Sequence, residues 1–129
     1  MKKIIFLLLW NLIGTVSEGQ ITQRNLDFQF VGTTLSGVLN VPEQGTVKGI
    51  VLIVHGSGRT NALEQNWHAD VRGAILRAGY ATYMWDKMGC GKSGGTFDPH
   101  QLVESSAAEV IAAIRLLKEK EIPGSDRIG

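Results

Sequence analysis

The chain has 129 residues, of which 13 are Lys or Arg and 12 are Asp or Glu, and its formal net charge is +1. This balance excludes a strongly basic nucleic-acid binder and an acidic disordered tail, so we expect no nucleic-acid partner. A single cysteine excludes a disulfide scaffold and a Cys-rich zinc module, and the length allows one domain at most.

Residues 1–19 have the pattern of a signal peptide. Two lysines precede the apolar run Ile4–Ile13, which is shorter than the roughly 20 residues of a membrane-spanning helix. Small residues follow, and we expect cleavage after Gly19, with cleavage after Ser17 as the alternative; a buried strand or an uncleaved anchor is the other interpretation. The sequence therefore predicts an exported protein, periplasmic or secreted, with residues 20–129 mature and no stable membrane anchor after cleavage.

The first part of the mature chain predicts strands. Residues 26–31 alternate apolar and polar side chains, which indicates a half-buried strand. Residues 32–34 favour a turn, and 35–41 predict a second strand that ends at Pro42, so the two strands form an antiparallel hairpin. Residues 47–54 are apolar on both faces, which is typical of a central strand in a sheet that is covered on both sides.

Helices and strands alternate after this point. Residues 67–78 predict a helix whose apolar face consists of Trp67, Val71, Ala74, Ile75 and Ala78. Gly79 is the expected left-handed C-terminal cap of this helix, and residues 80–85 predict a second buried strand. Trp67 is expected near the loop on the site side, where it can line a substrate pocket, although such a residue more often fixes a helix to the sheet.

A longer helix is expected to begin at Asp98, with Asp98 as N-cap, Pro99 in the first helical position and Gln101 closing a capping box. Its predicted apolar stripe is Val103, Ala107, Val110, Ile114 and Leu117. Residues 126–129 resemble the beginning of another strand. This element order predicts an α/β fold: an antiparallel edge hairpin followed by parallel strands with flanking helices.

The residues after the first buried strand, His55-Gly56-Ser57-Gly58, are the first candidate site. Sites in open α/β sheets form at the carboxyl ends of strands, and glycines there let backbone amides approach a ligand. The backbone N–H of Ser57 is the candidate oxyanion donor, with Gly56 and Gly58 shaping the loop. A tight turn without function is the simpler alternative. His55 is compatible with a general base or a ligand, and we favour a structural ring that holds the loop.

The second candidate loop, residues 86–95, contains a pattern that resembles a phosphate-binding loop, Gly91-Lys92-Ser93. Such a loop also needs a glycine five residues before Gly91. That position is Asp86, a carboxylate where a phosphate would lie. We therefore expect no nucleotide site.

The stretch 91–95 also matches the G-x-S-x-G pattern of a nucleophile elbow. An elbow requires a strand that runs into the serine and a helix that follows it at once. Here the predicted strand stops at Asp86 and the predicted helix waits until Pro99. We therefore interpret Ser93 as a turn or capping residue, and a nucleophilic role is the minority alternative.

No metal site or cofactor is expected, because His55, His68 and His100 lack the partners and spacing of a zinc site. Cys90 has no second cysteine with which to form an internal disulfide. It is expected to be a small turn residue, with a reactive thiol as the alternative.

Three stretches together resemble the α/β-hydrolase superfamily, in particular its bacterial serine aminopeptidase-like and dienelactone hydrolase-like branch. They are residues 35–39 before Pro42, residues 55–58, and residues 86–93. The last stretch is similar to the family pattern Asp-x-Arg-Gly-x-Gly-x-Ser, with Met88 in the place of the arginine. The resemblance spans residues 26–129 and implies that His55, Asp86, Gly89, Gly91 and Ser93 belong to structural loops of the site.

The resemblance also implies an activity: hydrolysis of an ester, thioester or amide in a small-molecule or peptide substrate, through an acyl-serine intermediate. In the family, the nucleophile, the acid and the histidine of the triad follow the strand that begins at Ile128. Residues 20–129 would then be the N-terminal part of such a domain, inactive alone and without a catalytic residue of their own. The alternative is a truncated product or a non-catalytic exported α/β binding module.

Overall fold

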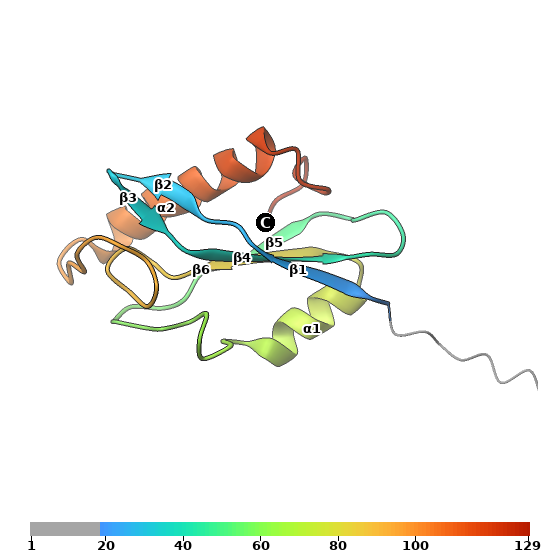
Figure 1. Cartoon of the computed structure of the whole chain (residues 1–129), viewed down its shortest axis with the longest axis horizontal. Coiled ribbons are helices and arrows are strands. Elements are labelled where there is room, and N and C mark those ends of the chain that lie inside the picture. Colours follow the sequence, from blue (N-terminus) through green and yellow to red (C-terminus); the bar gives the residue numbers. More distant parts are fainter. Residues whose placement is uncertain (1–18) are drawn as a thin grey trace, which may run out of the picture.

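The computed structural model describes residues 19–129, so the predicted signal peptide lies outside the described residues except for Gly19. The chain forms a four-stranded sheet in the order β1-β4-β6-β5, a separate two-stranded sheet and two helices (Figure 1). The elements in chain order are β1 (Ile21–Asn25), β2 (Phe28–Phe30), β3 (Thr33–Leu35), β4 (Gly37–Pro42), β5 (Ile50–Ile53), α1 (Ala69–Arg77), β6 (Ala81–Trp85) and α2 (Leu102–Glu119).

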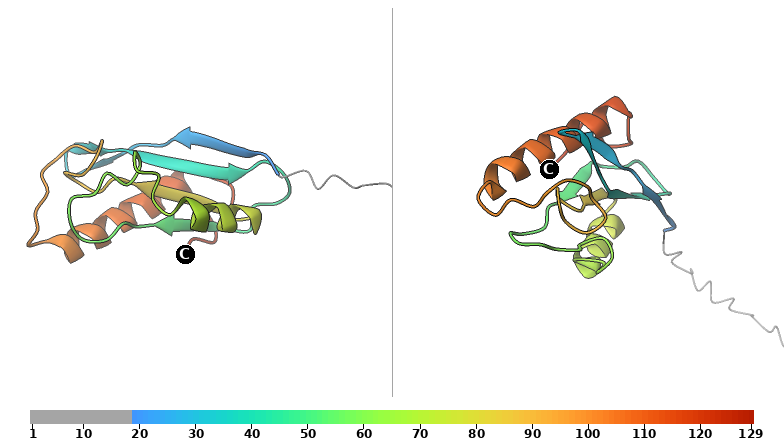
Figure 2. Two further views of the ribbon diagram at one scale, coloured as in Figure 1. Left: turned by 90° about the horizontal axis from the view of Figure 1, so that it is seen from below. Right: turned by 60° about the vertical axis from the view of Figure 1, so that its left-hand side comes forward.

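The sheet has a parallel pair of strands at one end and antiparallel strands in the rest, which confirms the predicted α/β architecture with its mixture of antiparallel and parallel strands. β5 and β6 are parallel, β6 and β4 are antiparallel, and β4 and β1 are antiparallel. On the other side of β5, Ile128 forms a parallel bridge with Ile50, as the predicted strand start at 126–129 requires. β5 therefore has backbone partners on both sides. Figures 1 and 2 show α1 and α2 on opposite faces of the sheet.

The N-terminal strands depart from the predicted single hairpin. A short hairpin does form between β2 and β3, around Val31 and Gly32, which both have positive φ. The predicted strand 35–41, however, is broken at Ser36, because the Ser36 amide donates to the Ser93 hydroxyl instead of to a strand, while its carbonyl accepts from the Asp86 amide just past the end of β6. The sequence analysis also missed β1, whose side chains are all exposed and therefore show no apolar alternation.

The main core lies between β6 and α2. All five residues of β6 are buried, and the rings of Tyr83 and Trp85 stack with centroids 5.8 Å apart. The edge of Trp85 meets Phe28 at 6.0 Å, and Ala113 and Leu117 of α2 are fully buried. Full burial of one large apolar side chain contributes about 1.5–3 kcal/mol. This packing holds β6, and the loop that follows it, in a fixed position.

The helix predicted at 67–78 exists as α1, but its buried face differs from the prediction. Val71 is 53% exposed, whereas Arg72 and Leu76 are buried. The Arg72 guanidinium donates hydrogen bonds to the Trp67 carbonyl and the Asn66 side chain, and these bonds turn the arginine face of the helix inward. Because burial disfavours its charged form, the pKa of Arg72 is lowered.

The end of α1 agrees with the prediction that Gly79 terminates it. Gly79 has a φ of +91° and its amide donates to the Leu76 carbonyl. A residue in the left-handed region is the usual way to end a helix, and glycine adopts that conformation at little cost. The chain then enters β6 two residues later.

The predicted start of the second helix at Asp98 is wrong, since α2 begins at Leu102. The Asp98 carboxylate accepts a hydrogen bond from the amide of His100 at 2.8 Å, which closes a local turn instead of capping a helix. Gln101 is the N-cap residue and makes no side-chain capping bond. The predicted stripe is also partly wrong, because Val103 is 78% exposed while Glu109 is buried.

Candidate functional site

The two glycine-containing loops lie side by side at the carboxyl ends of β5 and β6, because these strands are parallel neighbours. The imidazole of His55, which is 2% exposed, joins them directly. Its Nε2 accepts a hydrogen bond of 3.1 Å from the backbone amide of Lys87, and its Nδ1 lies 3.2 Å from the Gly56 carbonyl. Both contacts are satisfied when the ring is neutral and carries its proton on Nδ1.

The electrostatic surroundings also favour the neutral ring. Burial, followed by the nearby positive charge of Lys87, lowers the pKa of His55. The lone pair of Nε2 is already engaged by the Lys87 amide, so the ring has no free acceptor with which to abstract a proton from a substrate. Trp67 packs edge-on against the ring at 6.1 Å and holds it in place.

The backbone at Ser57 is open to a ligand. Gly56 and Ser57 are exposed, and a Cβ at Gly56 would meet no atom within 4 Å. Gly58 has a φ of +98°, a conformation that glycine adopts at little cost. Within residues 19–129, the Ser57 amide makes no hydrogen bond to the protein. This N–H is therefore available to an incoming oxygen atom.

Asp86, which is fully buried, fixes the second loop. One of its carboxylate oxygens accepts a hydrogen bond from the Leu63 amide at 3.1 Å, and the other accepts one from the Lys92 amide at 3.0 Å. The same carboxylate lies against Gly91, which has a φ of +47° and where a Cβ would collide with it. A buried carboxylate therefore occupies the position at which a phosphate-binding loop has a glycine.

Gly89 makes the second sharp turn of this loop. Its φ is +71°, and a Cβ there would collide with the backbone of Phe97. The two ends of residues 89–97 thus pack directly against each other, with the Gly89 amide donating to the Gly94 carbonyl at 2.9 Å. Cys90 is buried within the loop, and its thiol lies 4.0 Å from the Gly58 carbonyl.

The hydroxyl of Ser93 connects the second loop to the strand edge. It donates to the Asp86 carbonyl and accepts a hydrogen bond of 2.9 Å from the Ser36 amide. In the described part of the chain, no histidine bonds to this hydroxyl, so no general base is in place to activate it. Ser93 lies in a turn after β6, nine residues before the first residue of α2, whereas the serine of an elbow stands directly between a strand and a helix.

Sequence reasoning missed the buried carboxylate of Glu109, which is 1% exposed. It accepts hydrogen bonds from the Trp85 indole N–H at 2.8 Å, the Met88 amide at 3.1 Å and the Ser105 hydroxyl at 3.3 Å. Met88 stands where the resembled family has an arginine, and here its backbone rather than a cationic side chain makes the contact. The burial of Glu109 could have been inferred from its spacing, because Glu109, Ala113 and Leu117 are four residues apart and therefore lie on one helix face.

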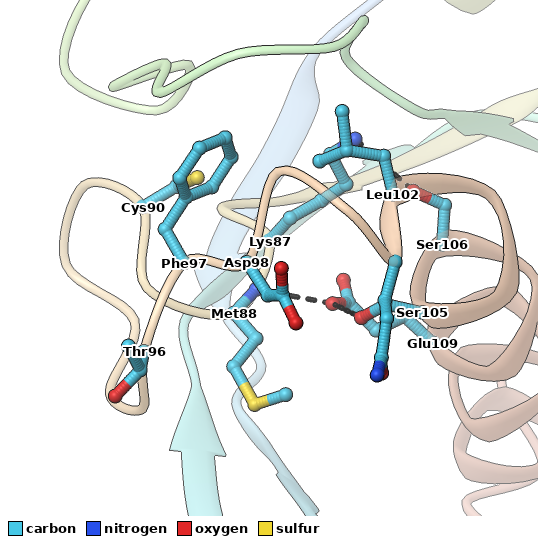
Figure 3. Close-up of a pocket in the computed structure, with 11 residues that line it drawn as sticks. Lys87, Met88, Cys90, Thr96, Phe97, Asp98, Leu102, Ser105, Ser106 and Glu109 are labelled. Atoms are coloured by element: carbon cyan, nitrogen blue, oxygen red, sulfur yellow. Dashed lines mark hydrogen bonds between the residues drawn. The ribbon is translucent and has the colours of Figure 1, made fainter.

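Glu109 borders a small cavity between the second loop and the first turns of α2 (Figure 3). Its volume is about 60 Å³, and the Lys87 ammonium on its wall donates to the Ser106 hydroxyl at 3.1 Å. The charged side chains on this wall are one cation, Lys87, and two carboxylates, Asp98 and Glu109. A cavity of this size with charged and hydroxyl groups on its wall accommodates water, and its negative balance disfavours an anionic ligand.

Comparison with known proteins shows which fold the chain shares. No protein-family model and no curated protein matches the chain. Among solved structures, an esterase from Pyrococcus furiosus has a TM-score of 0.66 at 20% identity, over 84% of this chain and 40% of the esterase. A cold-adapted esterase from an Arctic intertidal metagenomic library has a TM-score of 0.59 at 20% identity, over 88% and 52% of the two chains.

A hypothetical protein from Pseudomonas aeruginosa has a TM-score of 0.65 at 18% identity, over 100% of this chain and 40% of the other. The described residues therefore have the α/β-hydrolase fold, as the loop motifs predicted. At these identities the likeness establishes the fold alone. The chain spans about two fifths of the Pyrococcus and Pseudomonas proteins and about half of the Arctic esterase.

Two further observations concern membranes and metals. Within residues 19–129, neither α1 nor α2 combines the length and the apolar character that a membrane crossing requires. In the same residues, His, Cys, Asp and Glu side chains nowhere gather in a group of three that would suit a metal ion.

Proposed function

We propose that this chain is the N-terminal part of an exported serine hydrolase that cleaves an ester, thioester or amide bond through an acyl-serine intermediate. The backbone amide of Ser57 is one of the two donors of its oxyanion hole. One observation carries the proposal: the free, exposed Ser57 N–H stands at the carboxyl end of β5, beside the loop that follows the parallel strand β6. Donors held in this way stabilise a developing oxyanion by a few kcal/mol each.

The pairing around β5 supports the same proposal. Ile128 lies beside Ile50 on the side of β5 away from β6, so the segment that it opens runs toward the edge that carries Ser57. A serine at the end of that segment would face the Ser57 amide across the site. In this proposal the serine, the acid and the histidine of the triad lie outside the 129 residues, and the chain alone is inactive.

The oxyanion role is tested by removing the backbone N–H of residue 57 in the full-length protein. Ser57→Pro removes the N–H, whereas the control Ser57→Ala keeps it and removes only the side chain. We expect Ser57→Pro to lower kcat for a 4-nitrophenyl ester by about 10²–10³-fold and Ser57→Ala to leave it within a few fold. Equal kcat values in the two variants, with both folded by their thermal unfolding, would reject this role for the Ser57 amide.

Export is the part of the proposal that rests on residues 1–19. Export is supported by the two lysines, the apolar run and the small residues that precede Gln20. N-terminal sequencing of the protein recovered from the periplasm or medium should give Gln20 as the first residue. Retention of Met1 in the mature protein would contradict the cleaved signal peptide.

The second candidate is a non-catalytic binding module that uses the same two loops as a pocket. The engaged hydroxyl of Ser93 favours it, since this serine has no base beside it. A fluorophosphonate probe discriminates the candidates. Labelling of the full-length protein supports the hydrolase, and a protein that binds acyl ligands without labelling supports the module.

A further inference from the structure

A second recess borders the site: an open groove of about 390 Å³ between the two loops. Its walls come from the segment after Gly58 on one side and from the turn of the second loop on the other, and its lining residues are Arg59, Thr60, Asn61, Gly89, Cys90 and Gly91. The guanidinium of Arg59 is the charged group on these walls. The groove therefore has a positive balance, in contrast to the cavity beside Glu109.

The positive charge of Arg59 is not neutralised by a neighbouring acid. Among residues 19–129, Arg127 and Asp126 form the one ion pair within 4 Å, so Arg59 has no carboxylate partner there. The nearest buried acid of the second loop, Asp86, lies beneath Gly91 with both oxygens bonded to backbone amides. Glu64 accepts a hydrogen bond from the Asn61 side-chain amide.

The Arg59 side chain also has a defined position. Its Cζ lies 5.9 Å from the centroid of the Phe97 ring, within the range of a cation–π contact. This contact reduces the freedom of the guanidinium. A fixed guanidinium with free N–H groups is the protein group best suited to hold a carboxylate or a phosphate.

We propose that this groove binds the anionic oxygen group, a carboxylate or a phosphate, of a substrate whose acyl carbonyl lies at Ser57; the assignment rests on the proposed hydrolase function. Arg59 follows Ser57 by two residues, so the two backbone positions are at most about 7 Å apart. A carbonyl at the Ser57 amide and an anion held by the Arg59 side chain would therefore belong to one short acyl chain, such as a succinyl group. Arg59 then selects anionic over neutral acyl groups.

The kinetic test compares two esters of similar length in the full-length protein. Wild type should prefer 4-nitrophenyl hemisuccinate to the neutral 4-nitrophenyl pentanoate by its ratio of kcat/KM values. Arg59→Gln should lower this ratio about fivefold, and added salt should lower it in wild type. The matched control is Arg77→Gln, which removes an exposed arginine from the last turn of α1 and should keep the ratio. Equal ratios in the two variants overturn the proposal.

A binding test keeps the groove separate from the catalytic proposal. In ¹⁵N–¹H spectra of the full-length protein, propionate or methyl phosphate should shift the amides of Gly89 and Gly91, and the neutral propionamide should not. Arg59→Gln should abolish the shifts. A response to propionate alone assigns a carboxylate, and a response to methyl phosphate alone assigns a phosphate. No response, or an equal response to propionamide, overturns the site. If neither ester is hydrolysed, the hydrolase proposal fails while these spectra still decide the groove.

Discussion

The backbone amide of Lys87 donates a hydrogen bond of 3.1 Å to Nε2 of His55, and this bond joins the loops that follow two neighbouring strands. It requires a neutral imidazole, because a protonated Nε2 would present an N–H to another N–H. Residues separated widely in sequence are thus joined by a contact that depends on the protonation state of one ring.

This contact predicts how stability depends on pH. Burial, with help from the Lys87 charge, lowers the pKa of His55 in the folded protein below its ordinary value of 6.5, although Asp86 and Glu109 act in the opposite direction. As the pH falls through 6.5, the unfolded chain therefore takes up the proton first, and the free energy of unfolding decreases until the folded pKa is reached. Above pH 6.5 this contribution is fully present.

Urea unfolding of the full-length protein at pH 7.5 and at pH 5.5 measures the effect. His55→Gln should show a smaller loss of stability between the two pH values than wild type, because the titrating group is gone. The control is His100→Gln, which removes an exposed histidine and should behave like wild type. An unchanged pH dependence in His55→Gln would contradict the prediction.

Gly91→Ala should destabilise the protein by about 1–3 kcal/mol or more. Its φ of +47° is strained for a residue with a Cβ, and the added methyl group would collide with the Asp86 carboxylate. Gly56→Ala is the matched control, because its Cβ would have open space and its φ lies outside the left-handed region. Chemical unfolding should place the control within about 0.5 kcal/mol of wild type. Similar losses in both variants would contradict the structure of the second loop.

Glu109→Gln should cost about 1–3 kcal/mol. The carboxylate accepts bonds from Trp85, Met88 and Ser105, and the amide group of glutamine would direct a donor toward at least one of these donors. Glu104→Gln changes an exposed glutamate in the first turn of the same helix and should be nearly neutral. The chemical shift of the Trp85 indole N–H should change in Glu109→Gln and stay unchanged in Glu104→Gln.

Ser93→Ala should lower stability by about 1–2 kcal/mol, because the Ser36 amide loses its acceptor and the Asp86 carbonyl loses its donor. It should not abolish labelling of the full-length protein by a fluorophosphonate. Urea unfolding and the labelling reaction check the two halves of this prediction. Labelling that is lost in Ser93→Ala, in a variant that still folds, would assign the nucleophile to Ser93.

Much of the central sheet could be predicted from the sequence because its signals are local. The apolar run before His55 and the apolar residues of β6 both indicate buried strands, and both form strands. Gly79, which follows a predicted helix, has the left-handed conformation that ends a helix. The adjacency of the two candidate loops follows from parallel pairing, which a strand-helix-strand order makes the default. The roles of the loop residues in catalysis remain predictions.

The failures have physical causes in long-range contacts. β1 is held by backbone pairing with β4. Its side chains are all exposed, so its sequence has no apolar alternation that would indicate a strand. Arg72 is inward because it finds the Trp67 carbonyl and Asn66, and Glu109 is inward because three donors converge on it. Asp98 bonds to the nearest amide, His100, rather than to a helix that begins later.

The double pairing of β5 has a consequence for how the chain acquires its structure. Ile50 pairs with β6 on one side and with Ile128 on the other, so this end of the sheet is assembled from segments far apart in the order of synthesis. Such non-local pairing slows folding, because closing a long loop costs conformational entropy before the strand contacts that offset this cost can form. During synthesis, one edge of β5 has no backbone partner until Ile128 has emerged from the ribosomal exit tunnel. We therefore expect a chaperone that covers this edge to raise the yield of native protein.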